Sequence, residues 1–158
     1  MTSGIQNAIM ALDQTSWGRV EDAREKLVPL GAQIFPVVLE VYPRLRGFRA
    51  RAALLHTAFK FALTEPAAVA LGLMGLEDKS AFVREKACLL LAVSGRKDTL
   101  PALRNRVALG DPDGHAAAAI AAITEGDRNL YIDRARTGRV TLNIGGLIVP
   151  ETRGNTTV

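Results

Sequence analysis

Cysteine and aromatic side chains are scarce in this sequence of 158 residues, which holds one cysteine and only 5% aromatic residues. One cysteine excludes a disulfide framework within the chain, and this favours a reducing compartment. Apolar residues nevertheless make up 48% of the chain, so the core must be built from Ala, Leu, Val and Ile. Helices pack with this mixture, and we therefore expect an all-α fold. The cysteine itself, Cys88, lies in an apolar run and is interpreted as a small buried hydrophobe.

Histidine is also rare, because only His56 and His115 are present. Neither has a second metal-ligating side chain three or four residues later, as a metal pair on a helix would need. Glycine-rich phosphate loops and the G-x-S-x-G motif are missing too. His115 follows Asp111 and Asp113 and resembles a dyad, but a histidine behind two capping carboxylates is more often plain surface. We expect no catalytic, cofactor-binding or metal site.

Long hydrophobic runs are the third absence, since no stretch of about eighteen apolar residues could cross a membrane. The first residues carry no basic segment ahead of an apolar one, so we expect no signal peptide. Both observations predict a cytoplasmic location and no membrane partner.

The net charge is a modest +4, and its distribution is uneven. Residues 32–64 hold five Lys and Arg side chains against Glu40 alone, a local excess equal to the net charge of the whole chain. On a helix that starts near Gly47, spacings of three and four place Arg49, His56 and Lys60 on one face. We expect an acidic partner to bind there, with two further arginines at the rim. These candidate partner-binding residues are Arg44, Arg46, Arg49, His56 and Lys60.

Internal similarity recurs at a period of thirty-odd residues. Ala23, Ala53, Ala87 and Ala119 take comparable places in four helical segments, with spacings of 30, 34 and 32. Each unit is a helix that opens near a proline, a short Asp/Gly turn, and a second helix closed by glycine, as helix start and stop signals require. The pattern predicts four antiparallel helix pairs, with helices at 4–13, 17–30, 34–42, 47–63, 66–76, 81–94, 99–109 and 114–124.

The units resemble HEAT repeats over residues 3–126, best at Asp78 with Val83-Arg84 and Ala87, and at Asp111-Pro112-Asp113. The resemblance implies a right-handed α-solenoid of about four pairs over residues 1–126. It also implies a ladder of Asp and Arg between neighbouring repeats, in which Arg51 and Arg84 could take part.

Residues 127–158 have a different pattern. Residues 129–133 and 139–144 alternate like strands around a turn, which predicts a small β-hairpin or extended cap for the last helix, followed by a flexible tail. Helix 115–123 is apolar on every side, so we expect this cap to cover its bare face, with Leu130, Ile132, Val140 or Leu142 on Ala117 and Ala121.

The leading hypothesis for function is a non-enzymatic interaction scaffold, because solenoids offer a long preformed surface. Short bacterial HEAT-like chains resemble adaptors or immunity proteins that sequester a toxin. Two alternatives are a nucleic-acid-binding protein similar to HEAT-like DNA glycosylases and a protein similar to HEAT-like phycobilin lyases. Trp17 is interpreted as a cap of the core, with an exposed binding anchor as the alternative.

Overall fold

The computed structural model describes residues 2–150, and this part of the chain is all-helical. Its helices are α1 (Thr2–Met10), α2 (Trp17–Leu27), α3 (Phe35–Val41), α4 (Phe48–Ala58), α5 (Pro66–Leu76), α6 (Ala81–Ser94), α7 (Leu100–Leu109) and α8 (His115–Glu125). Short 3₁₀ segments follow several of them: η1 (Val28–Ile34), η2 (Tyr42–Arg44), η3 (Phe59–Phe61), η4 (Lys97–Thr99) and η5 (Arg128–Tyr131).

The predicted helices are confirmed, and each begins within two residues of its expected start. The largest difference is at the end of α4, where the helix tightens into the 3₁₀ turn η3. The predicted stop and start signals act as expected at several places. Gly95 and Gly126 end α6 and α8 with φ of +64° and +68°, a conformation that costs a glycine little. Pro66 and Pro101 lie in the first turns of α5 and α7.

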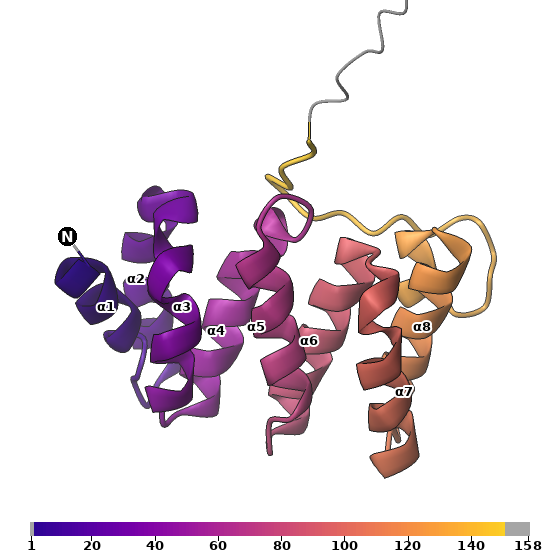
Figure 1. Cartoon of the computed structure of the whole chain (residues 1–158), viewed down its shortest axis with the longest axis horizontal. Coiled ribbons are helices and arrows are strands. Elements are labelled where there is room, and N and C mark those ends of the chain that lie inside the picture. The colour runs from indigo at the N-terminus through magenta and orange to yellow at the C-terminus, as the bar shows by residue number, and fades with distance from the viewer. Residues whose placement is uncertain (1, 151–158) are drawn as a thin grey trace, which may run out of the picture.

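The helices form two layers. Contacts join α1 to α3, α3 to α5 and α5 to α7, and they also join α2 to α4, α4 to α6 and α6 to α8. The odd-numbered helices therefore make one layer and the even-numbered helices the other, with the pairs following one another along the long axis (Figure 1).

Close packing between the layers depends on small residues. A Cβ atom added at Gly75 of α5 would lie 2.8 Å from Cβ of Ala87 and 3.1 Å from Cδ1 of Leu55. Gly75 thus lets α5 approach both α6 and α4, which explains why an apolar helix here contains glycine. Cys88 is buried in the same core, as expected, and burial raises the pKa of its thiol to about 12.

A buried ion pair joins the second and third helix pairs. The Nε of Arg51 lies 2.6 Å from Oδ2 of Asp78, and both side chains are less than a tenth exposed. The predicted contact of Arg51 with the turn of the next unit is therefore confirmed. Arg84 behaves differently, because its Nη1 donates to the carbonyl of Asp78 in its own unit. Asp111 accepts from the N–H groups of Ala116 and Ala117 and caps α8.

The predicted β-hairpin is wrong within the described residues, since residues 127–150 contain no strand. The side chain of Asp127 accepts from the N–H of Asn129 and starts the 3₁₀ turn η5. Tyr131 is buried there, and its hydroxyl donates to the carbonyl of Glu85. The buried Tyr131 and its hydrogen bond therefore bend the chain where an extended strand was expected.

The turn η5, rather than a hairpin, lies against α8. Leu130 lines one hollow with Ala117 and Ala121, whereas Val140 is 42% exposed and Leu142 lies at a different surface. The predicted flexible end, residues 151–158, lies outside the described residues. None of the helices between residues 2 and 150 has the length and apolar character to cross a membrane.

Candidate functional site

A hollow lies on the face formed by α2, α4 and α6, here named the even-helix face. It is a groove of about 470 Å³ whose floor comes from these helices and whose one wall comes from residues 142–145. We name it the basic groove. Its lining consists of Arg24, Val28, His56, Thr57, Phe59, Lys60, Lys86, Leu89, Leu142, Asn143, Ile144 and Gly145.

The cations of the basic groove come from α2, from α6 and from the turn after α4. Arg24 of α2 is paired with Glu21, with Nη2 and Oε1 2.5 Å apart. Lys86 comes from α6, and its Nζ lies 5.2 Å from the ring centroid of Phe82. Lys60 lies in η3, half-buried, with its Nζ 5.2 Å from the ring centroid of Phe61. Positive charge is thus held over apolar surface, where it is attracted by ring faces.

His56 stands between these cations at the last turn of α4. Its edge is exposed, but desolvation of the ring, followed by repulsion from Arg24 and Lys86, lowers the pKa of His56 below its usual value. The lowered pKa favours the neutral imidazole, which offers a hydrogen-bonding nitrogen to a ligand rather than a charge.

A smaller hollow of about 220 Å³ continues the groove and shares Arg24, His56 and Lys86 with it. Beside it the rings of Trp17, Phe48 and Phe82, here named the aromatic cluster, meet edge to face with centroids 5.5 to 6.1 Å apart. Trp17 is 46% exposed and Phe82 39%, so the interpretation of Trp17 as a cap of the core is wrong.

Arg49 belongs to the aromatic cluster rather than to the groove. Its guanidinium carbon lies 4.7 Å from the ring centroid of Phe48 and 5.5 Å from that of Trp17. Seven residues separate Arg49 from His56, which is about 10 Å along a helix. The three residues predicted to share one face therefore belong to two neighbouring sites. Arg49 lies in the aromatic cluster, whereas His56 and Lys60 line the basic groove.

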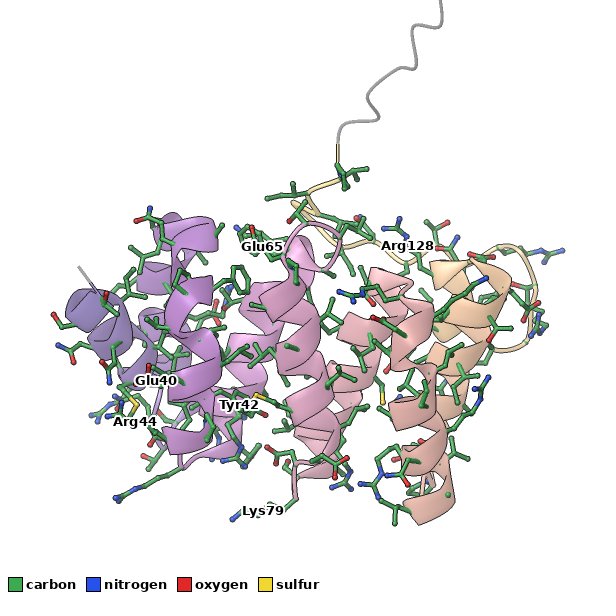
Figure 2. All side chains as sticks on the ribbon, in the orientation of Figure 1. Glu40, Tyr42, Arg44, Glu65, Lys79 and Arg128 are labelled. Atoms are coloured by element: carbon green, nitrogen blue, oxygen red, sulfur yellow. The ribbon has the colours of Figure 1, made fainter. Side chains whose placement is uncertain are left out.

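Arg44 and Arg46 lie elsewhere. Arg44 is exposed at the end of the stack that also carries Lys79, opposite Glu65 and Arg128 (Figure 2). Arg46 lies in the loop before α4, and its backbone N–H donates to Oδ2 of Asp13. These two arginines do not line the basic groove, because the turn before α4 is at the opposite end of that helix from Lys60, and their predicted place at the rim of a partner interface stays a prediction.

Arg24, Lys86 and Phe82 are site residues that the sequence analysis missed. The repeat carried only a coarse signal for two of them, since Arg24 follows the aligned Ala23 whereas Lys86 precedes the aligned Ala87, so they lie in the same part of their units but not at the same position. The residues from the C-terminal segment had no such signal, because only the path of the folded chain brings them to this face.

The hydrogen bonds of His115 are made with residues other than Asp111 and Asp113. The Nδ1 of His115 accepts from Nη2 of Arg134 at 2.8 Å, and it lies 3.2 Å from the hydroxyl of Tyr131, whose one proton is donated to the carbonyl of Glu85. Asp111 is occupied in capping α8. The histidine thus fastens η5 to α8. Within residues 2–150 no group of three or more His, Cys, Asp and Glu side chains is placed to hold a metal ion.

Comparisons with protein-family models, with curated proteins and with solved structures found no match for this chain.

Proposed function

We propose that this chain is a right-handed HEAT-like α-solenoid that binds an acidic protein partner on its even-helix face. In this proposal it is an adaptor or a toxin-neutralising protein and not an enzyme. The observation that carries the proposal is the position of the exposed aromatic cluster directly beside a groove lined by cations. Fold analogy alone would not select a function.

The aromatic cluster has the features of a binding anchor. Tryptophan and arginine dominate binding energy at protein interfaces, and here Trp17 and Arg49 lie in one stack of rings. Mutual contact of the three rings fixes them before binding, so little conformational freedom is lost on association.

Charge favours an acidic partner. The groove, the hollow and the adjoining stack contain the cations of Arg24, Arg49, Lys60 and Lys86, and Glu21 is the carboxylate among the lining residues. Such a field accelerates encounter with an acidic surface and weakens as salt is added. A nucleic-acid partner would be expected to use a longer cationic track, so that alternative becomes an outcome of the test.

The test is capture of partners from the native cell extract with the full chain and three variants. The first, Trp17→Ala with Phe82→Ala, removes the two exposed rings, and the second, Lys60→Glu with Lys86→Glu, reverses groove charges. The third, Arg44→Glu, is the matched control, because it changes an exposed cation at the other end of the stack.

We expect one acidic protein that the native chain and the Arg44→Glu control both retain and that both double variants lose. Retention of that protein by both double variants would contradict the proposal, and so would recovery of nucleic acid in its place. Thermal melting followed by circular dichroism verifies that each variant is folded before its binding is compared.

A further inference from the structure

The C-terminal segment does not leave the molecule after α8 but runs back along the even-numbered helices. In Figure 1 it passes from α8 along one end of the stack towards the turn between α4 and α5. Two hydrogen bonds donated by its backbone N–H groups hold the segment along this path. The N–H of Leu142 donates to Oδ1 of Asn129 at 2.8 Å, and the N–H of Ile148 donates to the carbonyl of Lys60 at 2.8 Å.

The segment is extended where it forms one wall of the basic groove. Leu142 and Ile144 are partly buried against the core, whereas Thr141 and Asn143 are exposed. Alternation with a period of two is the pattern of an extended chain lying on a surface. The groove is thus already shaped for a peptide whose apolar side chains are two residues apart.

The segment is a poor match for the charge of the groove. Residues 139–150 contain no Asp or Glu, although they lie beside Lys60 and Lys86. Neither lysine forms an ion pair with any residue in the described range 2–150. Asn143 is exposed between the two partly buried apolar residues and is among the residues that line the groove, so a carboxylate at this position would add a negative charge beside a groove lined by Lys60 and Lys86.

The segment is also lightly held. Val140, Ile148 and Val149 are each more than 40% exposed, and no strand pairs with the extended backbone in residues 2–150. A competing peptide therefore has little to displace, and it can use the same surface.

From these observations we propose that the basic groove binds an extended segment of the protein partner, with two apolar residues flanking an Asp or Glu. In the absence of the partner, residues 142–148 lie along the groove and supply one of its walls, and the partner segment displaces them when it binds. The inference rests on the proposed function, since it names the kind of partner segment that the even-helix face accepts.

The test uses two fluorescently labelled peptides as probes. One has the sequence of residues 139–150, and the other is the same peptide with Asn143→Asp. Each is titrated with the full native chain and with a full-length release variant, Leu142→Ser with Ile144→Ser, whose own segment no longer fits the groove. A second release variant, Asn129→Ala, removes the acceptor of the Leu142 N–H without changing a residue that lines the groove.

We expect both release variants to bind the native-sequence peptide, and the native chain to bind it roughly tenfold more weakly or worse, because a tethered competitor acts at high effective concentration. The Asn143→Asp peptide should bind several-fold more tightly than the native sequence, with an advantage that shrinks as salt is added. Adding Lys60→Gln and Lys86→Gln to a release variant should abolish that advantage and leave the native-sequence peptide bound.

Absence of peptide binding to both release variants would overturn the inference. Equal binding to native and released chains would show that the segment is no competitor, and an acidic peptide without advantage would remove the carboxylate from the proposal. Partner capture that still depends on Trp17 and Phe82 while the peptides fail to bind would leave the proposed function intact and refute this inference alone.

Discussion

The helical stack of residues 2–126 and the C-terminal segment of residues 127–150 are stabilised in different ways. In the stack, each helix packs on the next one in its own layer, α5 with α6 and α7 with α8 also pack closely across the layers, and buried apolar side chains repeat from unit to unit. In the segment, single polar contacts made by Asn129, Tyr131 and Asp133 determine the path. Repetition therefore makes the stack robust, whereas the segment depends on individual hydrogen bonds that a substitution or a ligand can replace.

The largest expected effect is in the stack, at the ion pair of Asp78. Asp78→Ala removes the acceptor of Arg51, Tyr42 and the Ser80 N–H and leaves a guanidinium buried without its counter-charge. Removing one partner of a buried pair costs about 3–5 kcal/mol. Urea denaturation should show this loss in the free energy of unfolding.

Asp98→Ala is the matched control, because the pair of Arg96 and Asp98 is exposed and joins residues of one turn. Exposed pairs of this kind contribute little, and we expect an unfolding curve that overlaps the native one. Equal losses for the two substitutions would show that Asp78 does not join the helix pairs as described.

Two glycines in the stack give a smaller contrast. Gly75→Ala should lower the free energy of unfolding by about 1–3 kcal/mol from crowding against Ala87 and Leu55, less the roughly 1 kcal/mol that alanine gains as a helix former. Gly18→Ala in α2 meets nothing within 4 Å and should raise the melting temperature. A rise for both variants in thermal melting would indicate that α5 and α6 are not in close contact.

At the junction of stack and segment, Tyr131→Phe tests the hydrogen bond that fastens η5. The variant keeps the buried ring and loses the hydroxyl that donates to the carbonyl of Glu85 at 3.2 Å. A loss of about 1 kcal/mol is expected. Hydrogen exchange should accelerate in residues 128–134 and stay unchanged in α4 and α5; acceleration throughout the chain would mean that segment and stack unfold as one.

The contrast between the two regions also explains what the sequence predicted. Helix positions were predictable because prolines, capping residues and glycines recur with the apolar period, and the contact of Arg51 with the neighbouring unit was implied by the resemblance to HEAT repeats. The segment was mispredicted as a hairpin, because alternation in residues 129–133 says nothing about the carbonyl of Glu85 that draws Tyr131 inward. Arg44 and Arg46 were grouped with the groove residues by proximity in sequence, although they lie in the turn before α4 and the length of that helix separates them from Lys60.

The smallest expected effect is a local change in the loop of residues 133–138 when the pH is lowered. The N–H of Thr137, with further hydrogen bonds from Gly138 and the Thr137 hydroxyl, lowers the pKa of Asp133 below its usual value. A carboxylate with a lowered pKa stabilises the folded loop fully above its unfolded pKa of about 3.9 and loses that contribution as the pH falls towards the folded value. The loop of residues 133–138 should therefore keep its structure at neutral pH and loosen below roughly pH 4. Amide resonances of Thr137 and Gly138, followed by NMR from pH 7 to pH 2.5, should shift together in acid, and an Asp133→Asn variant should show no such step. A change in the loop between pH 5 and 7 would mean that a group other than Asp133 controls it. Asp133 would then not be one of the single polar contacts that hold the segment.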